Sequence, residues 1–298
     1  MIQASDPFSD RLVDAIARLG PLCVGLDPHP ALLPKLFGAP GPEAFSRFFE
    51  GVIDVAAGRV AAVKPQIALF ERWGPRGLET LARLAARARA AGLIVLLDAK
   101  RGDIGSTAQG YVDAYLGPNA WLSADAVTVN AYMGLDSLEP WLTAARSQRR
   151  GVIALLRTSN AGAADVQELD AGGEPVWARL AAKLAPLTEE WRGARGWSSL
   201  MAVVGATAPA EARRARALLP HAPFLVPGYG AQGAGAAEAL SGAVWDGDRP
   251  LGVLVSASRS VLYPHAAAEA QSLSAWGDAI EGAIEAAKAE LAAVTSPA

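Results

Sequence analysis

The most restrictive feature of this sequence is a set of eight short, strongly apolar runs that recur along its length. Each run is nearly continuously hydrophobic rather than alternating, so we expect parallel strands that are covered on both faces. Amphipathic, helix-forming stretches separate the runs, as at 43–57, 77–91 and 210–219. The runs are LCVGLDP (22–28), VAAVKPQ (60–66), LIVLLDAK (93–100), AVTVNAY (126–132), GVIALLRTS (151–159), SLMAVVGAT (199–207), APFLVPGYG (222–230) and LGVLVSASRS (251–260).

The repeated order of strand and then helix predicts an α/β protein with a parallel sheet. Eight such units in one chain favour a closed (β/α)8 TIM barrel, and an open doubly wound sheet is the alternative. We expect a single domain over residues 1–298, with the barrel core at about 20–265 and a helical tail at 266–294. Two long loop-like stretches, 160–175 and 228–250, are candidates for functional loops because loops of that size are uncommon in compact domains.

Composition narrows the possible partners. The chain has 298 residues, a net charge of −3 and no dominant basic patch, so we expect no nucleic-acid partner. No apolar run is long enough to span a bilayer and the N-terminus lacks a signal pattern, so we expect a cytoplasmic protein without membrane contact. Cys23 is the single cysteine, and His29, His221 and His265 have no partners at metal-ligand spacing. We therefore expect neither a metal nor an organic cofactor.

Polar side chains gather at the carboxyl ends of the expected strands. In a barrel these ends converge on one face, where active sites form. A single polar residue there is often only a helix cap, but charged residues at four of the eight ends favour an enzyme. The residues are Asp27, Lys64, Asp98 with Lys100, Asn130, Thr158 with Ser159, Thr207, and Ser258 with Arg259.

The sharpest pattern is DAKRGDIGSTAQGY at 98–111. Asp98 and Lys100 are two apart on an expected strand, so their side chains point the same way. Asp103 follows a glycine and could fold back beside them, and two carboxylates would keep the Lys100 ammonium protonated. A surface salt bridge, with Asp103 as the N-cap of a helix begun by Ile104, explains the same spacing. The segment by itself leaves both interpretations open.

A phosphate site is predicted from a glycine-rich loop and an arginine. Gly228 and Gly230 allow a ligand to approach the backbone closely, and the loop after the seventh strand of a barrel is a frequent phosphate site. Arg259, after the eighth strand, offers a bidentate guanidinium. Gln232 could reach phosphate oxygens when the loop is closed, and Tyr229 could seal it. The loop and the arginine together are a much stronger signal than either one.

Several segments, in family order, resemble those of orotidine 5′-phosphate decarboxylases. The pattern D-x-K-R-x-D-I-x-x-T at 98–107 resembles the signature of that family. The resemblance is strongest to its longer bacterial subgroup (type 2), although Ala161 stands where that subgroup often has proline. It covers roughly residues 20–265. The other similar segments are VGLDPHP (24–30), VKPQIALFE (63–71), LLRTSNAG (155–162), VPGYGAQGAG (226–235) and SASRSVLYP (256–264).

The resemblance implies a reaction and a set of catalytic residues. The reaction is the cofactor-free decarboxylation of orotidine 5′-phosphate to UMP, the last step of pyrimidine nucleotide synthesis. Lys64, Asp98, Lys100 and Asp103 would form an alternating charged network, in which Lys100 donates a proton to C6. A fixed ammonium beside that carbon would stabilise the carbanion as it develops and then protonate it.

The resemblance also implies how the nucleotide is held. Asp27 would bind a ribose hydroxyl, and Ser159 would bond the pyrimidine, with Thr158 as the alternative one position away. Thr107 would contact the ribose, and like Asp103 it would do so from the neighbouring subunit. A homodimer with shared active sites is therefore expected.

Three other functions compete with this one. A metal-dependent sugar-phosphate decarboxylase or aldolase shares D-x-K-x-x-D, but Lys64 would repel its cation. A Schiff-base aldolase could use Lys64 or Lys100, but lysines flanked by carboxylates stay protonated, which is wrong for an amine nucleophile. A non-catalytic nucleotide-binding barrel would have the same fold, and the retained charged residues argue against it.

Overall fold

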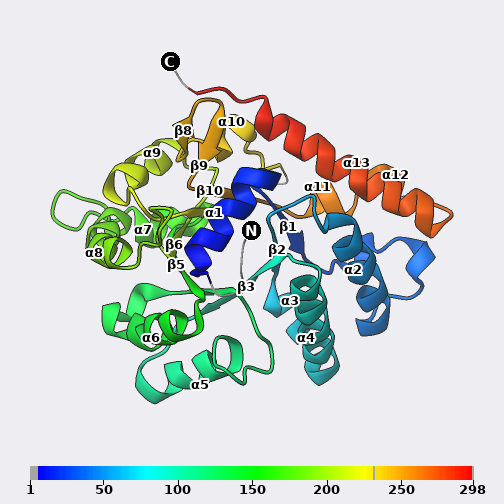
Figure 1. Ribbon diagram of the computed structural model, residues 1–298, viewed down its shortest axis with the longest axis horizontal. Helices are drawn as coiled ribbons and strands as arrows, with labels where there is room; N and C mark the ends of the chain where they lie inside the picture. Colours follow the sequence, from blue (N-terminus) through cyan, green and yellow to red (C-terminus); the bar gives the residue numbers. More distant parts are fainter. Residues whose placement is uncertain (1–5, 231, 297–298) are drawn as a thin grey trace.

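In the computed structural model, which describes residues 6–230 and 232–296, eight parallel strands close into a barrel surrounded by helices (Figure 1). The strand order β1-β10-β7-β6-β5-β4-β3-β2 returns to β1, so the predicted (β/α)8 barrel is confirmed. The barrel strands are β1 Leu22–Leu26, β2 Ala62–Pro65, β3 Ile94–Arg101, β4 Ala126–Val129, β5 Gly151–Arg157, β6 Leu200–Val204, β7 Phe224–Val226 and β10 Val253–Ala257.

Most of these strands are shorter than the apolar runs that predicted them. The last residues of a run turn into the loop at the carboxyl end, so Asp27, Thr158 and Ser258 each follow their strand directly. The seventh strand is the extreme case, because Pro227 and the left-handed Gly228 (φ 103°) end its pairing after Val226. The polar ends of the runs are therefore loop residues at the mouth of the barrel.

Helices cover the outside of the barrel and supply the connections between strands (Figure 1). The expected helical tail forms two helices, a short α12 and the long α13. The helices are α1 Phe8–Leu19, α2 Pro42–Ala56, α3 Ile67–Glu71, α4 Gly74–Ala90, α5 Gly105–Tyr115, α6 Glu139–Gln148, α7 Ala164–Gln167, α8 Val176–Glu190, α9 Pro209–Leu218, α10 Ala236–Ala239, α11 Arg259–Leu262, α12 His265–Ala268 and α13 Leu273–Ala292, with 3-10 turns at Pro30–Leu32, Lys35–Phe37, Ala131–Met133, Leu135–Leu138 and Ala161–Ala163.

Helix α1, which the strand-and-helix pattern did not include, crosses the amino-terminal end of the barrel (Figure 1). Its apolar face, which includes Phe8, Leu12 and Ile16, packs in one buried cluster with barrel residues such as Cys23 and Ile94. Burial of that apolar face favours docking of the helix. The helix therefore closes this end of the barrel, and the opposite end is left for a site.

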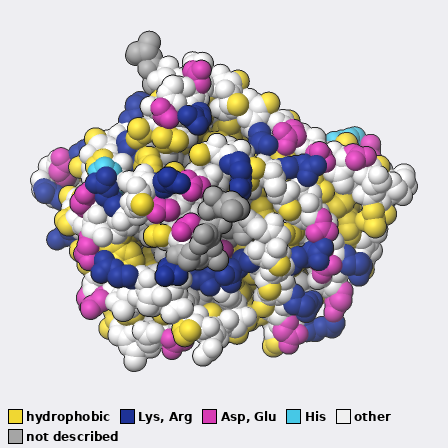
Figure 2. Space-filling view, in the orientation of Figure 1, with side chains coloured by type: hydrophobic (Ala, Val, Ile, Leu, Met, Phe, Trp, Pro, Cys, Tyr) yellow, Lys and Arg dark blue, Asp and Glu magenta, His cyan; other side chains and the backbone are white. Residues whose placement is uncertain are grey.

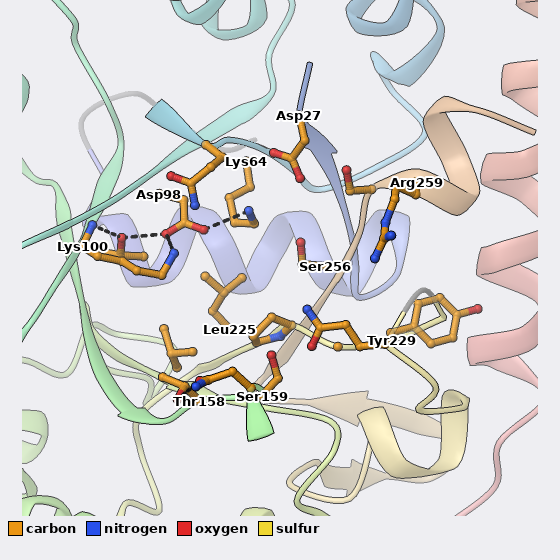
Figure 3. Close-up of a pocket in the computed structure, with 18 of the residues that line it drawn as sticks. Asp27, Lys64, Asp98, Lys100, Thr158, Ser159, Leu225, Tyr229, Ser256 and Arg259 are labelled. Atoms are coloured by element: carbon orange, nitrogen blue, oxygen red, sulfur yellow. Dashed lines mark hydrogen bonds and ion pairs between the residues drawn. The ribbon is translucent and has the colours of Figure 1, made fainter. Parts of the chain in front are cut away.

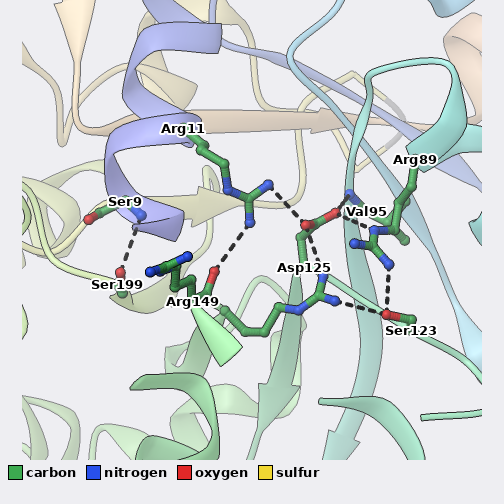
Figure 4. Close-up of polar contacts among 9 residues, drawn as sticks. Ser9, Arg11, Arg89, Val95, Ser123, Asp125, Arg149 and Ser199 are labelled. Carbon is green, nitrogen blue, oxygen red and sulfur yellow. Dashed lines mark hydrogen bonds and ion pairs between the residues drawn. The ribbon is translucent and has the colours of Figure 1, made fainter. Parts of the chain in front are cut away.

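A buried carboxylate fastens α1 to the strands (Figure 4). Asp125 is 2% exposed, and its Oδ1 accepts hydrogen bonds from Arg11 at 3.0 Å and Arg150 at 3.1 Å. Its Oδ2 accepts the Val95 amide at 3.0 Å and lies 3.6 Å from Arg89 Nε. These partners compensate for the desolvation of the carboxylate.

On the face of the molecule that carries α1, basic and acidic side chains are intermingled at the surface (Figure 2).

The stretch 228–250, which we expected to be a long loop, contains regular structure. Val244–Asp246 (β8) and Arg249–Leu251 (β9) pair as an antiparallel hairpin, and α10 precedes them. A Gly-Asp pair at 247–248 makes the two-residue turn, with Gly247 at φ 60°. Both strands are short and at least partly exposed, so hydrophobic periodicity does not reveal them. The other expected loop, 160–175, likewise contains α7.

Candidate active site

A cavity of about 750 Å³ opens at the carboxyl ends of the barrel strands (Figure 3). Polar side chains from strand ends all around the barrel line it, together with the apolar Leu155, Val203 and Leu225 of β5, β6 and β7. A concave site with apolar walls and a few convergent charged groups is typical of an enzyme. Of the residues predicted from sequence, the cavity brings together Asp27, Lys64, Asp98, Lys100, Ser159, Gly228, Gln232 and Arg259.

Asp98 lies between two lysines in this cavity (Figure 3). Its Oδ2 is 3.1 Å from Lys64 Nζ, and its Oδ1 is 2.6 Å from Lys100 Nζ. The Lys64 side chain is 8% exposed, whereas that of Lys100 is 46% exposed and open to the cavity and solvent. The strands thus place a protonatable, accessible ammonium beside a fixed carboxylate.

Electrostatics keep the buried pair ionised. Burial favours the neutral form of Asp98, but attraction to Lys64 and Lys100 outweighs it and lowers the carboxyl pKa to about 2. Burial likewise favours the neutral amine of Lys64, but Asp98 and Asp27 outweigh it and raise the pKa of that ammonium. This direction favours the ammonium form of Lys64, which is unsuited to act as an amine nucleophile.

Thr128, which the sequence interpretation did not single out, lies directly beneath this network. Its Oγ1 is 3.0 Å from Asp98 Oδ1 and accepts the amides of Ala99 and Lys100 at 2.9 and 2.8 Å. The only sequence signal for it is a hydroxyl inside an otherwise apolar strand, AVTV at 126–129.

Asp103 and Thr107 lie outside the cavity of their own chain. The Asp103 carboxylate accepts the Ile104 amide at 2.9 Å, and among the residues described it has no ion pair with Lys100. Helix α5 begins at Gly105 with Ile104 as its N-cap residue, so Asp103 is not the N-cap either. Thr107 is exposed in the first turn of α5. Within one chain, the charged network therefore has three members.

The residues directly after β1 and β10 present buried polar atoms to the cavity. Asp27 Oδ1 and Ser258 Oγ are buried, and neither has a hydrogen-bond partner within residues 6–230 and 232–296. Both side chains crowd Gly25, where a Cβ atom would lie 2.7 Å from Ser258 Cβ and 3.1 Å from Asp27 Oδ2. Tyr263 holds the loop by donating a hydrogen bond to the Asp27 carbonyl at 2.9 Å. Buried oxygens without partners in a cavity suit the hydroxyl groups of a ligand.

The geometry separates Ser159 from its neighbour Thr158. Gln167 of α7 binds Thr158 twice, at its amide (2.9 Å) and at its hydroxyl (2.7 Å), and Thr158 also donates to Asn160. The Ser159 side chain has no such bond within the part of the chain that is described, and it lines the cavity. Thr158 is thus committed to the 160–175 segment, and the Ser159 hydroxyl is left for a ligand.

The glycine-rich loop after β7 needs its glycines. Gly228, Gly230 and Gly233 have φ values of 103°, 69° and 93°, which side chains rarely adopt. Gly228 and Gln232 line the cavity, whereas Gly230 does not. The Tyr229 side chain also lines the cavity, while its hydroxyl points away from the cavity and donates to Glu290 of α13 (Figure 3).

Arg259 completes the arrangement at the other side of this loop. It is the first residue of α11, with Ser258 between it and the last barrel strand, and it lines the cavity across from Tyr229 (Figure 3). The cavity therefore has two ends, one with the Lys64–Asp98–Lys100 network and one with Arg259 and the glycine-rich loop.

Two features are absent from residues 6–230 and 232–296. Within them, no three histidine, cysteine, aspartate or glutamate side chains come together as a metal site. Within the same residues, no helix has the length and apolar character needed to cross a membrane.

The fold and the cavity define a barrel enzyme with a charged site at the carboxyl ends of its strands. Comparison with known proteins is more specific. Residues 20–261 match the family described as orotidine 5′-phosphate decarboxylase / HUMPS. The Rhodopirellula baltica orotidine 5′-phosphate decarboxylase is 38% identical over 93% of this chain and 96% of its own length. The Azoarcus enzyme of the same name is 46% identical over 81% of this chain and 84% of its own.

Solved structures agree with the sequence comparisons. A crystal structure from Streptomyces avermitilis has a TM-score of 0.79 and 36% identity, and covers 98% of this chain and 99% of its own. The Leishmania donovani OMP decarboxylase has a TM-score of 0.69 and 30% identity, over 95% of this chain and 98% of its own. The chain belongs to the orotidine 5′-phosphate decarboxylase / HUMPS family, and it is a carbon–carbon lyase of that family.

Proposed function

We propose that this protein decarboxylates orotidine 5′-phosphate to UMP and CO2, as the last step of pyrimidine nucleotide synthesis. The observation that carries the proposal is the Lys64–Asp98–Lys100 network at one end of a cavity whose other end holds Arg259 and a glycine-rich loop. The relatives at 38–46% identity carry the same activity in their names. A base placed at the lysines and a phosphate at Arg259 would fit the two ends.

The proposed chemistry needs only side chains of this chain and its partner. The bond from C6 to the carboxylate breaks, CO2 leaves, and the electron pair stays on C6. The Lys100 ammonium stabilises that charge and gives its proton to C6, and solvent water can return a proton because the side chain is 46% exposed. Asp98 holds the ammonium in place through its 2.6 Å contact. Lys64 keeps Asp98 ionised and oriented.

Binding roles follow from the position of each group in the cavity. The Asp27 carboxylate, with one buried oxygen unpaired, would accept a ribose hydroxyl, and the Ser159 hydroxyl would bond the pyrimidine. Gly228, Gly230, Gln232 and Arg259 would hold the phosphate, with Gly230 acting through the shape of the loop. Remote phosphate binding could then contribute to the chemical step.

Asp103 and Thr107 are proposed to act in the pocket of a partner subunit. Both lie at the mouth of the barrel but outside the cavity of their own chain. A two-fold dimer would place each α5 start beside the neighbouring cavity, and Asp103 would become the fourth member of the partner's network.

The direct test is the loss of orotidylate absorbance when the purified protein is added, with and without exhaustive treatment by EDTA. We expect full activity in both samples, because the Asp98 carboxylate that a metal would need is already occupied by two ammonium groups. Loss of turnover in EDTA and its return with Mg²⁺ would instead support a metal-dependent sugar-phosphate enzyme.

Sodium borohydride should not inactivate the protein in the presence of substrate. Trapping of a covalent adduct by borohydride would indicate a Schiff base.

Arg259→Ala should separate phosphate recognition from the rest of binding. We expect KM for orotidylate to rise by a factor equivalent to about 2–5 kcal/mol, the usual cost of removing one partner of a charged pair. Turnover of orotidine, which lacks the phosphate, should change far less. Steady-state kinetics with both substrates measure the difference, and equal losses for the two would show that Arg259 has a structural role.

A further inference from the structure

The hydroxyl of Thr128 makes all of its hydrogen bonds with the end of β3, the segment that carries Asp98 and Lys100. Thr128 is 1% exposed, and its Oγ1 accepts two amides, from Ala99 at 2.9 Å and from Lys100 at 2.8 Å. Its one proton is then available for Asp98 Oδ1 at 3.0 Å, the same oxygen that Lys100 Nζ contacts. A hydroxyl has one donor and two acceptor sites, so this arrangement is complete.

The strand needs this hydroxyl because its regular pairing fails at that point. Leu97 pairs with Val127 and Arg101 pairs with Val129, so three residues of β3 face Thr128 alone. Lys100 has φ 47°, an unfavourable conformation for a residue with a side chain. Such strain persists only where surrounding contacts enforce it. Two of those contacts are the amide bonds to Thr128 Oγ1, which replace the missing ladder bonds on this side of the bulge.

We propose that Thr128 is the positioning residue that holds the Lys100 ammonium and the Asp98 carboxylate in reactive alignment. It acts from below, through the backbone of Lys100 and through one oxygen of Asp98, and we assign it no contact with the reacting carbon. The inference rests on the proposed function, because the reaction defines which alignment of Lys100 is productive. It adds a neutral, buried fourth group to the three charged residues that one chain supplies.

The test compares Thr128→Val, which removes the hydroxyl and keeps the shape, with Thr128→Ser, which keeps the hydroxyl. We expect Thr128→Val to lower kcat by about 100-fold, the scale of a small misplacement of a catalytic group. KM should stay within about threefold, because the binding groups are elsewhere in the cavity, and Thr128→Ser should keep kcat within about tenfold of the wild type. A crystal structure of Thr128→Val should show Lys100 leaving the positive-φ region.

Thr188→Val is the matched control. Thr188 is 3% exposed and its hydroxyl also bonds the backbone, at 2.8 Å to Ala185, but it lies in α8. This variant should keep wild-type kcat, so a general effect of removing a buried hydroxyl can be subtracted. If Thr128→Val does not fold, Thr128→Ala and Thr128→Ser make the same comparison, since only serine retains the hydroxyl.

The outcomes separate this inference from the proposed function. Normal kcat in folded Thr128→Val would overturn the inference. Equal losses of kcat in the valine and serine variants would also overturn it, because serine keeps the hydroxyl and loses only the methyl group. A wild-type protein inactive on orotidylate would refute the proposed function instead. In that case the Lys100 backbone in the Thr128→Val crystal structure still decides whether the hydroxyl enforces this conformation.

Discussion

Lys100→Ala is expected to lower kcat for orotidylate by at least about 10⁴-fold, because one ammonium supplies both general-acid and electrostatic stabilisation. Its Nζ lies 2.6 Å from Asp98 and faces the cavity, so no neighbouring group can take over both roles from the same place. The fold should survive, since Asp98 keeps its contact with Lys64 at 3.1 Å. KM should change little because the charge acts on the transition state.

Two other variants show whether the effect of Lys100→Ala depends on the position of the lysine or on its positive charge. Lys183→Ala removes an exposed lysine of α8 and should leave kcat unchanged. Lys100→Arg keeps the positive charge but replaces a compact donor by a planar guanidinium that gives up no proton near neutral pH. It should therefore be nearly as inactive as the alanine variant. Substantial turnover by Lys100→Ala, measured by the orotidylate absorbance change, would show that Lys100 is not the proton donor.

Much of the fold was predictable because a parallel barrel leaves a strong trace in the sequence. Strands covered on both faces must be apolar throughout, so the eight runs stood out and their order fixed the class. The polar residues at the ends of those runs were equally informative. Asp27, Lys64, Asp98 and Arg259 come from distant parts of the chain, yet they line one cavity because all carboxyl ends of a barrel meet at one face.

Other features depend on tertiary contacts that leave a weak local trace. Helix α1 is held by burial of Phe8 and Leu12 against the amino-terminal end of the barrel. The strands of the β8–β9 hairpin are too short and too exposed for hydrophobic periodicity to reveal them. The role proposed for Thr128 rests on the register shift between β3 and β4, which no pattern of residues reveals. The direction of Tyr229 is set by Glu290, a residue 61 positions away.

Asp103 shows most clearly what the sequence and the contacts of one chain cannot reveal. Spacing allowed it to fold back onto Lys100 or to cap the next helix, and in the single chain it does neither. A residue that completes a neighbour's pocket cannot be recognised from the contacts of its own chain, since its partners lie on another molecule. Whether Asp103 acts in the pocket of its own chain or of a partner must therefore be tested on the dimer.

Mixed dimers provide that experiment. Lys100→Ala and Asp103→Ala homodimers should each be nearly inactive, because every pocket carries one lesion. Unfolding and remixing equal amounts should make about half of the dimers mixed, if pairing is random and the dimer is symmetric. If Asp103 serves the partner's pocket, both lesions of a mixed dimer fall in one pocket and the other pocket is intact. About a quarter of all pockets should then regain wild-type activity.

The matched control remixes Lys100→Ala with Asp98→Ala. Both residues line the cavity of their own chain and contact each other at 2.6 Å, so every pocket in a mixed dimer would keep a lesion and activity should stay low. Differently tagged subunits report whether chains have exchanged. Recovery of about one quarter of the activity in the first mixture and none in the control would support the shared pocket. The extent of subunit exchange is the same in both mixtures, so only the location of the two substitutions can explain the difference. Confirmed exchange with no recovery in the first mixture would place the action of Asp103 within its own chain and refute the proposed dimer site.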